Sequence, residues 1–540
     1  MPKKKTLQSL KRLCLEYVAD NMEHTWAKDY MENNQNENNS LNMLAPSPFI
    51  KLDDFLIQEL FQLLRYKGYR SSAMIYSLLV PQLTKLDLSY HTYTASESIA
   101  QVITVRCRSL TSLDLNSCSQ ISTDTLVDLV KALPGLLELN LSETQCDTQV
   151  LSTVGSFCTQ LYRLEIMECK RLSAYSLLCL AYDPVSGFLR CQMLENLRIG
   201  PWGPGNNRWN LLWAIVFVLL ALPNLRSFPH YLLTEALCVI HDQHLDAAEM
   251  PLGFPSLIDL AWFRINNAPN NERNRLTLGL LSVINVDEYF WPTAHAVCPH
   301  IVSMSVTLTG RPGLDQRFWS CHHLVFLEID CMDCMDMREL LPVVTSLESQ
   351  LIFLTVRGFS FIDEFSFHAL LSRCMNLQKL NIKFCSPQMC EFHVGTNLEA
   401  LVWDFSLPPL EFPHLCAFTL SYKDWNNPLP SQHKVRLKEC LESLLKCSPW
   451  LFDLELAFLP FNLDEVFARV LEPPGTALQG LRQLSLAGSY VTISAIHRLL
   501  SSDNELSHLM CMSTGIHSRE FEELLQRVER EGLEILVEWV

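Results

Sequence analysis

The 540-residue sequence is short of positive charge and has no apolar run long enough to cross a membrane. Lys and Arg number 42 against 59 Asp and Glu, which gives a formal net charge of -17. Nucleic acids and anionic membranes attract a surplus of Lys and Arg, so this balance argues against both as partners. The best candidate span, residues 211–222 (LLWAIVFVLLAL), is well below the roughly 20 residues that a spanning helix needs. We expect it to be a buried helix.

The sequence also lacks the short motifs that mark common catalytic and cofactor sites. It has no P-loop, no Gly-x-Gly-x-x-Gly after a strand, no Gly-x-Ser-x-Gly and no His-Glu-x-x-His. His241 and His244 have no third metal ligand nearby in sequence, and Cys331 and Cys334 form a Cys-x-x-Cys without a second pair at zinc spacing. We therefore expect no enzymatic activity, no cofactor and no metal site.

The cysteines and the start of the chain predict a cellular compartment. The first residues, MPKKKTLQSLKRLC, contain no long apolar core and no cleavage site of small residues, so they do not resemble a signal peptide. Twenty cysteines in such a chain predict reduced thiols in the cytoplasm or the nucleus, or in both.

A short pattern, Leu-x-x-Leu-x-Leu, recurs along most of the chain. Its clearest copies begin at Leu83, Leu110, Leu136 and Leu161, at intervals of 27, 26 and 25 residues. Further copies, several of them degenerate, begin at Leu194, Leu225, Leu257, Ile301, Leu324, Leu351, Leu377, Leu398, Leu415, Leu451, Leu481 and Leu506, and a last strand is expected near Leu533. Side chains alternate between the two faces of a strand, so the Leu-x-Leu part buries both leucines on one face.

The segments between the copies predict helices, and the two elements together predict an array. Residues 122–133 (STDTLVDLVKAL), for example, have apolar residues at helical spacing. One strand with one helix cannot bury its own apolar face, so each unit needs its neighbours. We predict an α/β solenoid, a horseshoe with a parallel concave sheet and convex helices, preceded by an α-helical N-terminal module.

Residues 107–141 (CRSLTSLDLNSCSQISTDTLVDLVKALPGLLELNL) resemble the cysteine-containing class of leucine-rich repeat found in ubiquitin-ligase receptors. The match is clean over residues 83–169 and 324–385, whereas the intervals stretch to between 31 and 44 residues around 194–301. We place the repeats at 81–540, irregular at 194–301. The insertions at 201–208 and 266–275 are either solvated connectors or functional edges of the horseshoe.

The N-terminal region divides into a helix over residues 1–28, a mobile polar linker over 29–48 and a helical segment over 49–80.

Residues 9–18 (SLKRLCLEYV) resemble the BC-box by which VHL-box and SOCS-box proteins bind Elongin C. The resemblance implies that Leu10 fills an apolar pocket of Elongin C, with Cys14 and Val18 along the same face. Their spacing of four residues places all three on one side of a helix.

The segment that follows resembles the cullin-2 box through Leu52, Leu56 and Leu60. Asp53 stands where that family has Pro, so the choice of cullin stays open, with cullin-2 favoured over cullin-5. The same segment resembles the start of an F-box, which implies a Skp-type adaptor, but the later Cys and Trp of that motif are missing from residues 65–82. A third interpretation makes both helices a cap on the first repeat.

The resemblance implies the substrate-recognition subunit of an Elongin BC–cullin RING ubiquitin ligase, with Elongin C, Elongin B, a cullin and a protein substrate as partners. The outward strand positions Asp87, Asp114, Glu165, Arg198 and Arg357 are the candidate substrate-binding residues. Acidic residues dominate in the first half, which favours a basic segment of the partner or is only a solvated surface. The alternatives are a non-ligase scaffold or inhibitor, an F-box-like receptor, and an enzyme within the irregular region.

The docking and capping interpretations predict different exposures for the first helix. A helix that serves only as a cap should bury Leu10 and Cys14 against the first repeat. A helix that docks a partner should leave at least part of that face open.

Overall fold

The computed structural model of the chain describes residues 2, 9–33, 46–69, 71–92, 94–200, 202, 207–267, 276–309, 321–360, 365–385, 408–422, 431–472 and 477–539. These residues fall into two compact units, each described here by itself. The first contains Leu7–Val283 and Thr293–His300, and the second consists chiefly of Ile284–Pro292 and Ile301–Val540. Within the described ranges, no helix combines the length and the apolar character that a membrane span requires.

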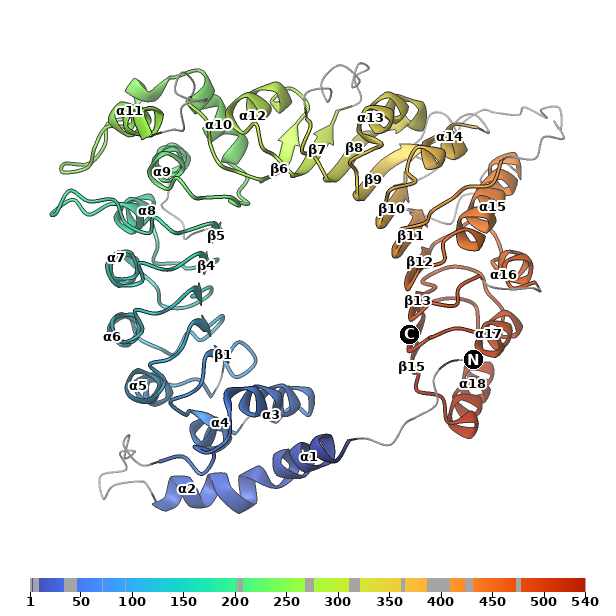
Figure 1. Cartoon of the computed structure of the whole chain (residues 1–540), viewed down its shortest axis with the longest axis horizontal. Helices are drawn as coiled ribbons and strands as arrows, with labels where there is room; N and C mark the ends of the chain where they lie inside the picture. Colours follow the sequence, from blue (N-terminus) through green and yellow to red (C-terminus); the bar gives the residue numbers. More distant parts are fainter. Residues whose placement is uncertain are drawn as a thin grey trace. The chain divides into compact units, whose positions relative to one another are not determined.

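The first unit contains a sheet of parallel strands in chain order. The strands are β1 (Lys85–Asp87), β2 (Ser112–Asp114), β3 (Glu138–Asn140), β4 (Arg163–Ile166) and β5 (Asn196–Ile199). The helices between and after them are α5 (Glu97–Arg106), α6 (Thr123–Ala132), α7 (Thr148–Phe157), α8 (Ala174–Ala181) and α9 (Arg208–Ala221). Figure 1 shows α5 to α8 stacked along one side of these strands. These helices do not cover the other face of the sheet.

The leucine pattern explains why these elements form and how they align. The middle leucine of each copy pairs with its equivalent in the next strand and is buried; these residues are Leu86, Leu113, Leu139, Leu164 and Leu197. The helices contribute the opposite side of the core: α6 begins after Ser122, whose side chain accepts a hydrogen bond from the Thr125 amide, and buries Leu126 and Val130. The predicted leucine-rich-repeat fold is confirmed.

The repeat cysteines belong to the turns after the strands. The Cys169 thiol is buried and donates a hydrogen bond to the Leu141 carbonyl of the preceding repeat, with an Sγ–O distance of 3.1 Å. Cys118 makes the equivalent contact to the Leu88 carbonyl at 3.8 Å, and burial raises its pKa to about 12. A thiol with this pKa stays protonated at neutral pH, so Cys118 acts as a neutral donor that joins adjacent repeats.

The N-terminal module consists of α1 (Leu10–Met22), a π-helical turn (Glu23–Ala27), α2 (Lys28–Asn33), α3 (Asp54–Tyr66) and α4 (Ser72–Leu78). Helical structure therefore continues past residue 28, where we placed the end of the first helix, and most of the expected linker, residues 34–45, lies outside the described residues. α3 covers the edge of β1. The Asp54 carboxylate accepts hydrogen bonds from the Thr84 amide at 3.1 Å and the Thr84 hydroxyl at 2.5 Å, and Gln58 donates to the Lys85 carbonyl at 2.6 Å.

Replacing Asp54 by alanine is expected to lower the free energy of unfolding by about 1–2 kcal/mol at pH 7, because the half-buried Thr84 donors lose their acceptor. Burial opposes ionisation of Asp54, but hydrogen bonds from Thr84 hold its pKa below the ordinary value. The contribution is therefore present above the pKa of the unfolded chain and is lost as the pH falls through the folded pKa.

Urea unfolding at pH 7 and below about pH 4 checks this expectation, since the difference from wild type should narrow in acid. The exposed Asp128 on α6 provides the matched control, and its alanine variant should unfold like wild type at both pH values. An unchanged or larger difference at low pH would contradict this role for the ionised carboxylate.

The irregular region departs from the predicted strands at two places. The strand predicted at Leu257 is wrong. Residues Leu257–Asn267 form helix α11, which buries Leu257, Leu260 and Ala261 at helical spacing. Its start is fixed by Ser256, whose hydroxyl oxygen accepts from the Asp259 amide at 3.1 Å. The spacing Leu-x-x-Leu suits a helix turn as well as this repeat, and the following Trp262 is exposed rather than buried.

The next strand after the copy at Leu225 is β6 (Ser282–Asp287), which we did not predict and which stands in place of the strand expected at Leu257. Ser282 pairs with Ser227, which in turn pairs with Asn196 of β5, so the copy at Leu225 is reduced to a single bridging residue between two strands. The other elements of this region are α10 (Leu233–His241), a 3-10 turn (Leu245–Ala247) and α12 (Trp291–Val297). Most of both expected insertions, residues 201–208 and 266–275, lies outside the described residues.

The second unit contains a longer parallel sheet in chain order from β6 to β15. After β6 its strands are β7 (Ser303–Leu308), β8 (Phe326–Asp336), β9 (Phe353–Ser360), β10 (Lys379–Phe384), β11 (Ala417–Tyr422), β12 (Asp453–Ala457), β13 (Gln483–Ser485), β14 (His508–Cys511) and β15 (Leu536–Trp539). The helices are α13 (Leu341–Leu347) after a 3-10 turn (Met337–Leu340), α14 (Ser366–Ser372), α15 (Ser431–Lys446), α16 (Asp464–Val470), α17 (Ile493–Ser501) and α18 (Ser518–Glu531). The predicted copies from Ile301 to Leu506 and the last strand are confirmed, except that the copy at Leu398 lies outside the described residues.

Two cysteines of the second unit are paired, whereas we expected reduced thiols throughout the chain. Cys334 and Cys385 form a disulfide, with 6.0 Å between their Cα atoms, although the sequence predicted reduced thiols. Cys334 follows the repeat part of β8 and Cys385 follows β10, so parallel strands bring together two residues that lie 51 positions apart. Cys331 remains a free, buried thiol, and the Cys-x-x-Cys is therefore not a pair of its own.

Candidate docking helix and sheet surface

Helix α1 is attached to α3 by one apolar side and by ion pairs. Ser9 caps its start by accepting a hydrogen bond from the Arg12 amide at 3.2 Å. The buried side consists of Leu15, Ala19 and Met22. Lys11 lies 2.8 Å from a Glu59 oxygen, and Asp20 forms an ion pair with Lys67 and accepts a hydrogen bond from the Tyr69 hydroxyl at 3.2 Å. These contacts fix which face of α1 points outward.

The outward face of α1 is apolar, which is unusual for a surface helix. Leu10 is 77% exposed, Tyr17 is 65% exposed and Leu13 is 50% exposed. Cys14 is exposed as well, and Val18 is half-buried at the margin. We call Leu10, Leu13, Cys14 and Tyr17 the open face of α1. A helix that served only as a cap would bury Leu10 and Cys14, and α1 buries the other side.

The three residues predicted to contact a cullin differ in their exposure. Leu52 and Leu56 are half-buried at the start of α3, whereas Leu60 has no exposed surface and packs in the core. Leu60 therefore supports the fold and does not belong to a docking surface in this conformation. Sequence reasoning missed Phe55, which is 61% exposed and lies under the Lys11 ammonium at 4.1 Å from the ring centroid. Its position on the polar side of an otherwise amphipathic α3 is the signal that could have identified it.

Four of the five predicted substrate-binding residues lie in one row across the first sheet. Asp87 pairs with Asp114, and the row continues through Asn140 to Glu165 and Arg198. Asp114, Glu165 and Arg198 line a hollow of about 340 Å³, together with Glu138 and Arg163 from the neighbouring row, which the prediction did not include. Arg357 is not part of this row: it lies on β9 in the second unit and pairs with Glu328.

The charges in this hollow are mixed. The Arg163 guanidinium lies 2.7 Å from a Glu165 oxygen, and Arg198 lies 3.9 Å from the other. A hydrogen bond from the Tyr162 hydroxyl holds the pKa of Glu138 below its ordinary value. Burial raises the pKa of Asp114, assisted by the nearby charges of Asp87 and Glu165. The surface therefore offers both acidic and basic groups to a partner, since Asp87 at its edge also lies 3.5 Å from the Arg65 guanidinium.

The described residues contain no group of three or more His, Cys, Asp and Glu side chains that could hold a metal ion. His241, one of the two histidines singled out in the sequence, lies 3.0 Å from an oxygen of Asp242.

The fold and its repeated leucine contacts define the chain as an α/β leucine-rich-repeat protein with a helical N-terminal module. No protein-family model matches the sequence, and no curated protein matches it either. Solved structures do match, among them a chain from the crystal structure of a Rad7 and Elc1 complex in yeast. That chain has 15% sequence identity and a TM-score of 0.41, and the match covers 89% of this chain and 93% of that chain. At this identity and TM-score the likeness carries no argument about function.

Proposed function

We propose that the chain is the substrate-recognition subunit of an Elongin BC–cullin RING ubiquitin ligase. The observation that carries the proposal is the open face of α1, where Leu10 and Cys14 of the BC-box pattern are exposed while Leu15, Ala19 and Met22 anchor the helix. An amphipathic helix recognised in a groove presents such a row of apolar side chains. The motif and the exposure are independent observations, because the motif does not specify which side of the helix faces the protein.

In this function, the chain's own residues bind and position. Leu10 enters an apolar pocket of Elongin C, and Cys14 and Val18 extend the contact along the helix. The half-buried Leu52 and Leu56 and the exposed Phe55 are the accessible apolar residues at the start of α3, next to α1. We assign the cullin contact to them, with cullin-2 favoured over cullin-5. Ubiquitin transfer belongs to the partner subunits, so no residue here acts as a catalyst.

The repeats hold the substrate in this function. The uncovered face of the β1–β5 sheet carries the row from Asp87 to Arg198, and its hollow provides carboxylates and guanidinium groups within a few ångströms of one another. Such alternating charges select a partner by complementarity more than they add to affinity. The substrate segment that fits this hollow carries both charge signs.

The test is co-expression of the full chain with Elongin B and Elongin C, followed by size-exclusion chromatography. We expect one stable complex of the three proteins, which then binds cullin-2 more tightly than cullin-5. A parallel co-expression with a Skp-type adaptor distinguishes the F-box interpretation, and a complex in that arm alone would replace our proposal. If the chain elutes apart from both adaptors, the repeats remain as a scaffold or inhibitor without a ligase.

A further inference from the structure

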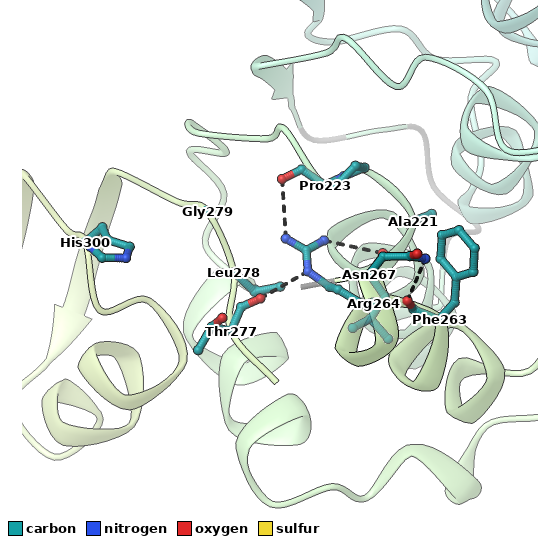
Figure 2. Close-up of a pocket in the computed structure, with 10 residues that line it drawn as sticks. Ala221, Pro223, Phe263, Arg264, Asn267, Thr277, Leu278, Gly279 and His300 are labelled. Carbon is teal, nitrogen blue, oxygen red and sulfur yellow. Dashed lines mark hydrogen bonds between the residues drawn. The ribbon is translucent and has the colours of Figure 1, made fainter. Parts of the chain in front are cut away.

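A pocket of about 410 Å³ lies in the irregular part of the first unit, away from the regular strands. Its walls come from the carboxyl end of α9, from α11 and from the segment before β6. Figure 2 shows the Arg264 guanidinium between Pro223 and Thr277, with Phe263 and Asn267 beside it on α11. The volume is within the range of roughly 300–1,000 Å³ that is typical of small-molecule sites.

The Arg264 side chain is held by peptide carbonyl groups. Its Nε donates to the Thr277 carbonyl at 3.0 Å, and its Nη1 donates to the Leu219 carbonyl at 2.9 Å. Longer contacts of 3.4–3.5 Å reach the carbonyl oxygens of Leu220, Leu222 and Pro223. These carbonyls end α9, where the last turn lacks intrahelical donors and carries partial negative charge. The arginine therefore closes the end of α9.

The positive charge of Arg264 has no ionised partner within the described part of the chain. Among the described residues that line the pocket, none has an acidic side chain. Burial lowers the pKa of Arg264 to about 10, so the group remains cationic at neutral pH. Burial also raises the pKa of the nearby Cys298 thiol to about 12, so that group supplies no anion. Peptide dipoles offset only part of a full charge, so the guanidinium can still attract an anionic group.

The remaining walls are largely apolar, with polar side chains from Asn267, Thr277 and His300. Leu220, Ala221 and Leu278 are buried side chains of the lining, and the half-exposed Phe263 ring stands at the edge. The Asn267 side chain donates to the Phe263 carbonyl at 2.9 Å, which keeps its amide group at the same edge. A largely apolar lining with one guanidinium group among its described residues has the features of a site for a small, largely apolar ligand that carries a negative group.

We propose that this pocket binds a small organic molecule with an apolar body and one carboxylate group, oriented by the charge of Arg264. The apolar body contacts Leu278 and Phe263, and the carboxylate faces the guanidinium, where the Nη2 group has only the long contact to Pro223 among the described residues. The site is independent of the proposed Elongin binding and uses none of its residues.

The probe is a matched pair of compounds, phenylbutyrate and phenylbutanol, titrated by calorimetry into the full-length protein. We expect the acid to bind at least about tenfold more tightly than the alcohol, because a charge-assisted contact in a buried site is about twice as strong as a neutral one. Equal binding of both would overturn the role of the charge. Absence of heat from the acid at millimolar concentration would overturn the site itself.

The variant Gly279→Leu tests whether the acid binds in this pocket. A Cβ at Gly279 would lie 3.4 Å from the Pro223 carbonyl oxygen and 3.7 Å from that of Leu225, so the backbone accepts a side chain that then fills the pocket. We expect binding of the acid to be lost, with the Arg264 contacts retained. Trp262→Ala, on an exposed position of α11 outside the lining, should bind like wild type. Unchanged binding by Gly279→Leu would place the ligand elsewhere and overturn the proposal.

Discussion

The double substitution Leu10→Ala with Cys14→Ala is expected to weaken Elongin C binding by at least about 100-fold, since a buried anchor residue at an interface contributes roughly 2–4 kcal/mol or more. Both side chains are exposed in the chain alone, so their removal leaves no cavity. The melting temperature should therefore stay close to that of wild type. Calorimetric titration with the Elongin B–Elongin C complex, beside thermal unfolding of the free protein, measures both quantities.

Two single variants of the same helix serve as controls. Arg12→Ala removes a charge on the polar side of α1 and its contact to Glu16 at 2.8 Å, and it should bind as wild type does. Leu15→Ala removes a buried side chain and should lower the melting temperature. If the double variant binds within about threefold of wild type, the open face of α1 is not the Elongin site.

Leu60→Ala is expected to lower the free energy of unfolding by about 2–5 kcal/mol, because it leaves a cavity in a fully buried part of α3. The sequence placed Leu60 in a cullin-binding set with Leu52 and Leu56, and the structure gives it a different role. We therefore expect the loss of stability to occur without any partner present. Urea unfolding of the free protein, followed by circular dichroism, measures it.

Phe55→Ala on the same helix is the matched comparison. Its ring is largely exposed, so this variant should change stability by less than about 1 kcal/mol and should weaken cullin binding in the assembled complex. A Leu60→Ala protein that unfolds like wild type but no longer binds a cullin would show that α3 turns its buried side outward on binding. That result would restore the sequence-based assignment of Leu60.

The repeats could be predicted because their signal is physical and local. Alternation in Leu-x-Leu is the period of a strand, and equivalent leucines such as Leu113 and Leu139 meet in the sheet. The same reasoning failed at Leu257 because Leu-x-x-Leu is also one turn of a helix. It missed β6 because Asn285, with φ of 54°, stands where the pattern expects an apolar residue. A positive φ of this kind is a backbone property that a hydrophobic pattern does not record.

The candidate site could be predicted in part. Spacing placed Leu10, Cys14 and Val18 on one side of a helix, but α1 has a second apolar side made by Leu15, Ala19 and Met22. Which of two apolar sides is buried depends on tertiary packing against α3, and no local pattern contains that information. Arg198 of the sheet hollow was predicted, whereas its neighbours Glu138 and Arg163 were missed. Arg163 and Glu165 share one face of β4 because they are two residues apart, but Glu138 and Arg198 reach them only through the parallel register of the neighbouring strands.

In the proposed function, the two apolar sides of α1 place folding and partner binding under separate selection within thirteen residues. Among descendants of this chain that lost the partner, Leu15, Ala19 and Met22 should persist, because the module cannot pack without them. Leu10, Cys14 and Tyr17 should drift toward polar residues, because an apolar surface without a partner favours aggregation. A faster substitution rate at the exposed positions than at the buried positions of this helix would then identify lineages that have lost the interaction.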